Sequence, residues 1–497
     1  MDRHNEVLSD IAIKVRQFYD RKEPFRIYHG STNSTRPLSF RRDKTVDTSR
    51  LSNVLKIDTQ KRTALVEPNV PMDRLVEATL KHGLVPPVVM EFPGITVGGG
   101  FAGSAGESSS FKHGCFDRTV NWVEMVLANG DIVIASPREK RDLFYGAAGS
   151  LGTLGVTTLL ELQLVEAKSY VELTYHFTSD VSETIQKLDE ATKEPSNVYV
   201  DGILFALNEG VVMTGHLTDV VRDDVRSQRF VRARDPWFYL HAKRLRKKNA
   251  IQVTEAIPIV DYLFRFDRGA FWTGAYAFKY FVTPFNRITR WVLDTYMHTR
   301  VMYHALHQSG HAKQYIIQDL ALPYANAQKF ITYVDQALGL YPLWLCPLYQ
   351  DSNPGITLHP LGSTGKKDGK SDAMLMNVGV WGPGPRSHAA FVDTNQKLEH
   401  KVRELSGKKG LYACTYYTED EFWGIYDRGW YDTLRQKYDA ESLPTVYDKV
   451  KYDPKQYTTE DHSTWGLWLL SLFWSIWPLS GLYGVFCATF GRDYLLK

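Results

Sequence analysis

Residues 96–114 read TVGGGFAGSAGESSSFKHG and contain the pattern G-x-G-x-x-G from Gly98 to Gly103. This is the spacing of the phosphate-binding fingerprint in Rossmann folds. A Rossmann loop also needs a buried strand that runs directly into the first glycine and an apolar helix after the last one. Here Pro93-Gly94 interrupts the strand that would have to lead into Gly98. The segment ESSSFKHG, which follows the glycines, offers a poor apolar face for a helix. We therefore reject a Rossmann fold and expect a glycine loop of another kind.

Dense glycines let the backbone approach a ligand closely and turn successive N–H groups toward one anion. A second donor-rich loop, RIYHGSTNSTRP, follows a short apolar segment near the N-terminus and contains Gly30 to Ser34. A third glycine turn spans Gly152 to Gly155. Three such segments in one chain predict a single long cofactor that carries phosphate groups.

The whole-chain composition excludes several classes of protein. A chain of 497 residues needs two or three lobes, and 43% apolar with 23% charged residues is typical of a globular protein. A net charge of +3 is too small for a nucleic-acid-binding protein. The four cysteines form no C-x-x-C pair and are expected to be free thiols in a reducing compartment.

The first 165 residues predict an α+β unit with antiparallel strands. Asn129-Gly130 joins two apolar runs and is a strong hairpin signal. From about residue 170 the chain alternates strands with helices and becomes rich in aromatic residues. We place an FAD-binding domain at 20–168, a substrate (cap) domain at 169–385, a segment that closes the active site at 386–456, and an apolar tail at 463–491.

The tail, STWGLWLLSLFWSIWPLSGLYGVFCATFG, contains no charged residue and no histidine. A membrane-crossing helix needs roughly 20 apolar residues, so the length suffices. Pro478 near its middle and the dispersed tryptophans also fit a kinked span or a hairpin that dips into one leaflet. The alternative is packing on the protein's own core or on a second copy in a homodimer. We favour contact with membrane lipid.

The order RIYHGSTNSTR, then PGITVGGGFAGSAGESSSFKHGCFDRTVNWVEMVLANGDIV, then DLFYGAAGSLGTLGVTTLLELQL resembles the FAD-binding module of the vanillyl-alcohol-oxidase (p-cresol-methylhydroxylase) superfamily. YPLWLCPL, LYACTYYTEDEFWGIYD and LPTVYDKV are similar to segments of the delta-24-sterol reductase family. The resemblance covers roughly Phe25 to Lys451. It implies an α+β fold with a bipartite FAD-binding module of the vanillyl-alcohol-oxidase type, an α+β substrate domain and an apolar C-terminal tail.

The resemblance also implies the residues that contact FAD. At the pyrophosphate these are Gly30, Ser31, Thr32, Asn33 and Ser34; at the flavin they are Thr96, Val97, Gly98, Gly99, Gly100, Phe101, Ala102, Gly103, Ser104, Ala105, Gly106, Glu107 and Ser108; near the adenine they are Gly152, Thr153, Gly155 and Val156. Many superfamily members carry a flavin-linked histidine in the slot that Asn33 occupies here. An amide cannot form that bond, so we expect non-covalent FAD, with His29 and His113 as the only nearby histidines.

The family implies reduction of the C24=C25 double bond of a sterol side chain, with NADPH as the reductant of FAD. An isolated alkene must be protonated as hydride arrives, which calls for a buried acid. Our candidates are Glu107, whose alternative role is to cap its own loop, and Tyr412 and Tyr416, which share one face if LYACTYYTED is a strand. They too match the family, and for both tyrosines orientation of substrate or core packing stays open.

The sequence leaves two other functions open. A flavin oxidase or dehydrogenase acting on another isoprenoid or alcohol, and a non-catalytic flavin-bound scaffold at the membrane, are the alternatives. No carboxylate is interleaved with His304, His307 and His311, so no metal site is predicted. The family implies attachment to the endoplasmic reticulum membrane with the catalytic part in the cytosol. Animal and plant members carry an apolar N-terminal anchor, whereas this chain has its apolar stretch near the C-terminus.

Overall fold

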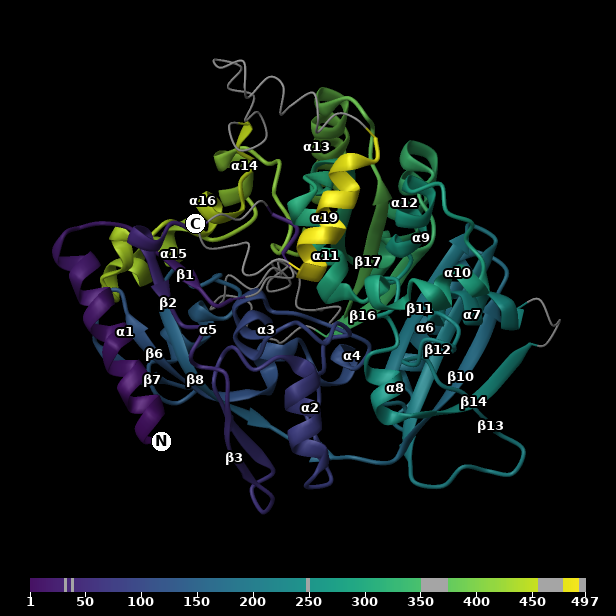
Figure 1. The fold of residues 1–497 in the computed structure, drawn as a ribbon, viewed down its shortest axis with the longest axis horizontal. Coiled ribbons are helices and arrows are strands. Elements are labelled where there is room, and N and C mark those ends of the chain that lie inside the picture. The colour runs from purple at the N-terminus through teal and green to yellow at the C-terminus, as the bar shows by residue number, and fades with distance from the viewer. Residues whose placement is uncertain (31–33, 37–39, 247–250, 350–373, 455–476, 491–497) are drawn as a thin grey trace.

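The computed structural model describes residues 1–30, 34–36, 40–246, 251–349, 374–454 and 477–490. Two sheets lie on opposite sides of the molecule, with the glycine-rich segment between them (Figure 1). The first sheet is antiparallel, with the order β3-β4-β8-β6-β7. Its strands are β3 (Val54–Asp58), β4 (Thr63–Val66), β6 (Val120–Leu127), β7 (Ile132–Ala135) and β8 (Gly155–Gln163).

The predicted hairpin is confirmed, because β6 and β7 pair around Asn129 and Gly130. Gly130 has a φ of 88°, a conformation that only glycine adopts at little cost. Two small pairs complete this unit: β1 (Arg26–Tyr28) with β2 (Thr45–Asp47), and β5 (Leu84–Val85) with β9 (Val165–Glu166). Its helices are α1 (Asp2–Asp20), α2 (Met72–Leu80), α3 (Val97–Gly103), α4 (Ser110–His113) and α5 (Arg141–Ala147).

The glycine pattern lies on α3, which begins where the Thr96 side chain accepts a hydrogen bond from the Gly99 N–H at 3.1 Å. Every strand pair of the five-stranded sheet is antiparallel, and the chain from β5 to α3 is irregular. The fold is therefore not a Rossmann fold, as predicted. The glycines form a short helix, because a capping threonine precedes residues that can pack closely.

The second sheet has nine strands in the order β13-β14-β10-β12-β11-β16-β17-β15-β18 and is antiparallel apart from the β13–β14 pair. Its strands are β10 (Tyr170–Thr178), β11 (Tyr199–Ala206), β12 (Glu209–Thr218), β13 (Arg226–Ser227), β14 (Gln252–Pro258), β15 (Tyr315–Pro323), β16 (Leu343–Tyr349), β17 (Met374–Pro383) and β18 (Lys408–Lys409). The prediction of two α+β units is confirmed.

Helices pack on both faces of this sheet, and one of these faces lies toward the interior of the molecule. The associated helices are α6 (Val181–Lys193), α7 (Phe238–Arg246), α8 (Ile259–Leu263), α9 (Thr273–Tyr280), α10 (Arg287–Val292), α11 (Thr299–Gln308), α12 (Tyr324–Leu338) and α13 (His388–Glu404). Alternate residues of the strands, such as Leu320 and Val378, pack with α6, α12 and α13 in one core. Their neighbours, such as Ile317 and Trp381, belong to a second core that continues into the first unit.

The C-terminal segment contacts both units instead of forming a separate one. β18 extends the nine-stranded sheet, whereas α15 (Arg428–Lys437) and α16 (Val446–Val450) return to the first unit after α14 (Glu419–Trp423). Tyr431 donates a hydrogen bond to Thr153 at 2.8 Å, and Lys449 donates one to the Leu151 carbonyl at 2.7 Å. Through these contacts the C-terminal segment lies against the glycine turn at Gly152.

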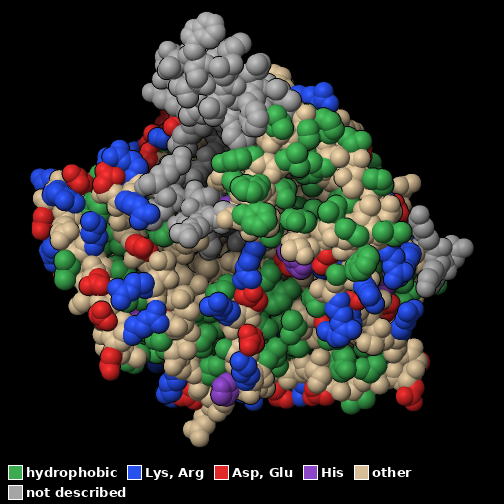
Figure 2. Space-filling model, viewed as in Figure 1, with side chains coloured by type: hydrophobic (Ala, Val, Ile, Leu, Met, Phe, Trp, Pro, Cys, Tyr) green, Lys and Arg blue, Asp and Glu red, His purple; other side chains and the backbone are tan. Residues whose placement is uncertain are grey.

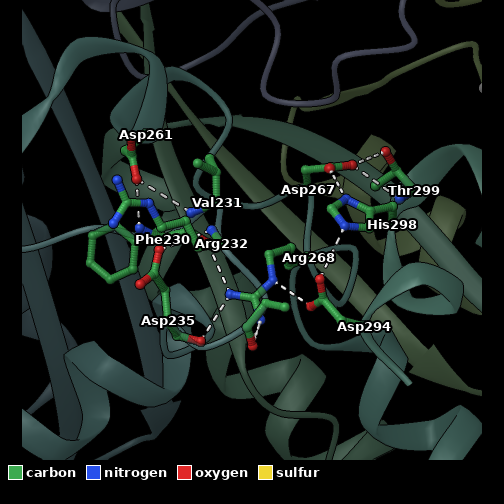
Figure 3. Close-up of polar contacts among 11 residues, drawn as sticks. Phe230, Val231, Arg232, Asp235, Asp261, Asp267, Arg268, Asp294, His298 and Thr299 are labelled. Atoms are coloured by element: carbon green, nitrogen blue, oxygen red, sulfur yellow. Dashed lines mark hydrogen bonds and ion pairs between the residues drawn. The ribbon is translucent and has the colours of Figure 1, made fainter. Parts of the chain in front are cut away.

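A buried ionic network fixes the start of α11 (Figure 3). Asp267 accepts hydrogen bonds from the Thr299 N–H at 3.0 Å and from the His298 ring, which also lies 3.5 Å from Asp294. Arg268 donates to Asp294 at 2.7 Å. Hydrogen bonds to Asp267 and Asp294 raise the pKa of His298 to about 9, so this imidazole is protonated at neutral pH. The network thereby holds α11 at one orientation relative to the sheet.

The described part of the tail contains α19 (Leu479–Phe490), which lies against α11 (Figure 1). Its buried residues are Ser480, Gly481 and Gly484. A Cβ at Gly484 would lie 2.7 Å from the Ala305 carbonyl oxygen, so glycine permits this close approach. Across the described ranges, no helix has both the length and the apolar composition needed to cross a membrane. Residues 463–476 of the predicted tail lie outside those ranges.

Candidate active site

A cavity of about 360 Å³ lies between the first unit and the face of the nine-stranded sheet that carries Asp319 and Trp381. All three predicted loops contribute to its wall, through Ser34, through the segment from Thr96 to Gly106, and through Leu151 and Gly152. These segments lie far apart in the sequence. The structure therefore brings the three donor-rich segments together around one site, as expected for a single long cofactor.

The glycine segment divides into residues that line the cavity and residues that support it. Those in the wall are Thr96, Gly98, Gly99, Ala102, Gly103, Ser104, Ala105 and Gly106. Those outside the wall are Val97, Gly100, Phe101, Glu107 and Ser108, all buried. Val97, Gly100 and Phe101 form the buried face of α3, and the assignment of residues 96 to 108 as FAD contacts stays a prediction.

Two kinds of glycine occur in this wall. A Cβ at Gly98 would lie 2.7 Å from Pro68, and one at Gly106 would lie 2.8 Å from Leu348, so both let the segment pack closely. Gly103 is different, because a Cβ there would meet no atom within 4 Å. It faces open space in the cavity, where a ligand could approach the backbone.

The loop at residues 30–34 is described only at its ends. Ser34 lines the cavity and donates a hydrogen bond to the Tyr412 carbonyl at 2.7 Å. Ser31, Thr32 and Asn33 lie outside the described residues, so the predicted role of Asn33 stays a prediction. Of the two nearby histidines, His29 lines the cavity and His113 does not.

His29 is neutral at pH 7, since burial, together with the charge of Lys449, lowers its pKa to about 4. Gly30 has a φ of 83° and is not itself in the wall.

The third turn reaches the cavity through Gly152, and its predicted FAD contacts stay a prediction. Gly152 lines the cavity with a φ of 71°, and Thr157 joins it from β8. Thr153, Gly155 and Val156 are not in the wall. A Cβ at Gly155 would lie 2.6 Å from the Val126 carbonyl oxygen, so this glycine serves the contact between β8 and β6.

One end of the cavity is cationic. Arg26, Arg36 and Lys449 line it next to Ser34 and Gly152. Burial, reinforced by the charges of Arg26 and Arg36, lowers the pKa of Lys449 to about 7. Several like charges at a buried site are costly, and an anion between them relieves that cost. This end therefore fits a pyrophosphate group.

Another part of the wall combines carboxyl groups with aromatic rings. Glu91, Asp319, Tyr303, Trp381 and Tyr412 line it. Strand alternation explains part of this set, because Asp319 on β15 and Trp381 on β17 point to the sheet face opposite the core with α12 and α13.

Glu91 is an unusual carboxyl group. It is enclosed by the protein, and its Oε2 atom has no hydrogen-bond partner among the described residues. Burial raises its pKa to about 8, with the charges of Asp319 and Glu107 adding to the effect. The acid form of Glu91 therefore predominates at neutral pH.

Asp319 and Tyr412 lie beside this group. Burial raises the pKa of Asp319, which accepts a hydrogen bond from Asn377 Nδ2 at 3.1 Å. Burial and the charge of Asp319 raise the pKa of Tyr412 well above its usual value. The Tyr412 hydroxyl has no hydrogen-bond partner within ordinary distance in the described ranges, so it is available to a ligand.

Glu107 does not line the cavity. Its carboxylate accepts hydrogen bonds from the Ser108 hydroxyl at 2.7 Å, the Ser109 N–H at 2.9 Å and the Ser109 hydroxyl. The Ser108 carbonyl in turn accepts a hydrogen bond from the Val200 N–H at 2.8 Å, which links this loop to β11. This is the loop-capping role, and the geometry offers no support for Glu107 as a proton donor.

Tyr412 and Tyr416 do not share a strand face. Residues 411–417 form turns with a single bridge at Thr415, so the strand expectation is wrong. Tyr416 stacks on Tyr452 with ring centroids 5.1 Å apart and lies outside the cavity wall. Of the two tyrosines, only Tyr412 reaches the site.

Sequence reasoning missed Glu91 and Asp319, although a signal was present for each. Glu91 is the only charged residue in LVPPVVMEFPG, and Asp319 is the only one in YIIQDLALP. A lone carboxylate in an apolar run is rarely left without a partner or a function. Neither run gives any sign that the two residues meet.

The arrangement fits FAD, whose pyrophosphate matches the cationic end and whose ring needs polar edges and close backbone contacts. Gly103 supplies a test. We expect Gly103→Leu to fill part of the cavity and to weaken FAD binding by at least tenfold in a fluorescence titration. Gly429→Leu is the matched control, because Gly429 is exposed on α15. Equal FAD affinities for the two variants would contradict this placement.

Comparison with known proteins agrees with the site. A family model described as an FAD binding domain matches residues 7–136. Delta(24)-sterol reductase from Macaca fascicularis and from Homo sapiens are each 29% identical to the chain over 459 residues, covering 90% of this chain and 86% of the relative. The Arabidopsis thaliana Delta(24)-sterol reductase is 30% identical over 436 residues, covering 82% and 76%. The chain therefore belongs to the Delta(24)-sterol reductase family and is an FAD-dependent oxidoreductase.

Proposed function

We propose that this protein reduces the C24=C25 double bond of a sterol side chain, with non-covalently bound FAD and with NADPH as the reductant. The observation that carries the proposal is that the wall of one cavity contains both a cluster of cations and buried carboxyl groups. Its relatives, which are Delta(24)-sterol reductases, support the same substrate class. When bound, FAD would supply hydride from its N5 position.

The cationic end would hold the pyrophosphate of FAD. Arg26, Arg36 and Lys449 would provide the charge, and Ser34 lies in the same wall. The wall from Gly98 to Gly106 would face the ring system. This orientation directs the reactive edge of the cofactor toward the opposite end of the cavity.

The protein must supply a proton, because an isolated alkene has no carbonyl group to polarise. Glu91 meets the requirement better than the other side chains of the wall. Its acid form is maintained by burial, and its Oε2 atom lacks a partner among the described residues. In the reaction the proton passes from Glu91 to one alkene carbon while hydride reaches the other.

Asp319 and Tyr412 would act through Glu91. A charge on Asp319 favours retention of the proton on Glu91, since two carboxylates at one dry site repel each other. Tyr412 would orient the alkene or carry the replacement proton toward Glu91 after turnover. These roles make both side chains positioning residues.

We also propose that the protein is attached to a membrane surface. The outer face of α19 exposes Leu482, Phe486 and Phe490 to 51%, 60% and 74% of their areas. In Figure 2 hydrophobic side chains gather over the region where α19 lies. Apolar surface of this kind binds the boundary between lipid headgroups and acyl chains. A sterol dissolved in the bilayer would then be close to the enzyme.

The reductase proposal predicts a specific effect of Glu91→Gln. With desmosterol and NADPH as substrates, the wild-type enzyme with FAD should give a product heavier by two hydrogens. Glu91→Gln should slow this by roughly 10²–10⁴-fold, the usual contribution of a general acid, while FAD binding is retained. Turnover of the wild type should fall as the pH rises through about 8, because Glu91 then loses its proton.

Glu107→Gln makes the matched control for the Glu91 variant. It should lower thermal stability, because a capping carboxylate is removed, yet keep the fall in turnover near pH 8. Loss of the pH dependence in Glu107→Gln, with Glu91→Gln fully active, would overturn the assignment. If desmosterol were unchanged while an alcohol reduced the flavin, the oxidase alternative would replace the reductase.

Membrane attachment is tested with vesicles of phosphatidylcholine and phosphatidylserine. Burial of a large apolar side chain is worth about 1.5–3 kcal/mol, so Leu482→Ser with Phe486→Ser should weaken vesicle binding by more than about tenfold. The control is Ile132→Ser with Ile134→Ser, since both residues are exposed on β7. Equal binding of the two double variants would exclude α19 as the attachment face.

A further inference from the structure

A second, smaller cavity adjoins the first and has not been assigned a role. Its volume is about 140 Å³, and α9, α11 and α19 contribute most of its wall. Apolar side chains such as Ala277, Val301 and Val485 dominate the lining. Tyr303 and Trp381 line both cavities, so the two spaces adjoin at these rings.

The polar groups of the second cavity lie away from that partition. Ser309 follows the last turn of α11. It lies six positions after Tyr303 in the sequence, which corresponds to roughly 9 Å along the helix axis. Tyr280 and His311 lie near Ser309, with their ring centroids 4.7 Å apart. Burial lowers the pKa of His311, so its neutral ring can donate or accept a hydrogen bond.

The outer wall is α19, which is held by few polar contacts. Tyr280 and Ser480 share a hydrogen bond of 3.3 Å, and Trp477 Nε1 donates to the Tyr280 carbonyl at 2.7 Å. A Cβ at Gly481 would lie 2.4 Å from the Tyr280 ring. The helix thus rests on α9 and α11 through small residues, while its exposed side is apolar.

We propose that this second cavity holds the ring system of the sterol, with the ring hydroxyl among Tyr280, Ser309 and His311. The alkene-bearing side chain then extends between Tyr303 and Trp381 toward Glu91. This inference rests on the proposed sterol reduction and assigns the part of the substrate that does not react. A flat apolar body with one hydroxyl at its far end matches a narrow apolar space with polar groups at one end.

The cavity is small for this ligand, since small-molecule pockets usually measure roughly 300–1,000 Å³. α19 must therefore move outward as the rings enter. Its contacts allow this, because a helix that rests on glycines and serine loses little apolar burial on its inner side. The entrance would open on the same face as Leu482 and Phe486, where lipid is expected.

Photolabelling of the full chain loaded with FAD tests the position of the rings. A sterol with a diazirine in ring B should label peptides from residues 299–309 and 479–490, and excess desmosterol should prevent this labelling. A sterol with the diazirine at the end of its side chain should instead label the peptide that contains Glu91. Ring-B labelling confined to the Glu91 peptide, or no labelling that desmosterol prevents, would overturn the inference.

A pair of variants gives a second measurement. Ala277→Leu fills the second cavity without touching the first, and should weaken binding of the fluorescent sterol dehydroergosterol by at least tenfold. Ala389→Leu is the control, since Ala389 is exposed on α13. Equal affinities would overturn the inference even if desmosterol is reduced normally. Ring-B labelling at α11 and α19 without any sterol reduction would instead refute the proposed function and leave the sterol site standing.

Discussion

Exclusion of water from a few charged side chains is the constraint on which this molecule depends. The cavity between the two sheets is lined by the cations Arg26, Arg36 and Lys449 and by the carboxyl groups of Glu91 and Asp319. Burial lowers the pKa of Lys449 to about 7 and raises that of Glu91 to about 8. Burial thus makes the site of Lys449 favourable for an anionic cofactor and keeps a proton on Glu91.

Packing between the two units maintains this dry space. The buried Glu107 carboxylate organises the loop after α3, and the Val200 N–H binds the Ser108 carbonyl from the edge of β11. On the far side, Lys449 binds the Leu151 carbonyl and closes the C-terminal segment over the glycine turn. Glu107 contributes to function through this structure, and the reacting group is a different carboxyl.

The sequence predicted local features well and spatial ones poorly. Glycine loops, the Asn129-Gly130 hairpin and the α+β class follow from backbone preferences that act over a few residues. The proximity of Glu91 and Asp319 depends on how a loop of the first unit packs against β15 of the second. No local sequence pattern predicts this packing. Tyr416 was misplaced for the same reason, because a turn at residues 411–417 sends it into the core with Tyr452.

The direction in which FAD lies along the cavity is the central claim, and a crystal structure of the FAD complex tests it most directly. The account predicts electron density for the pyrophosphate among Arg26, Arg36 and Lys449, and for the flavin ring next to Glu91 and Tyr412. A flavin ring at the cationic end, or FAD bound outside this cavity, would contradict it.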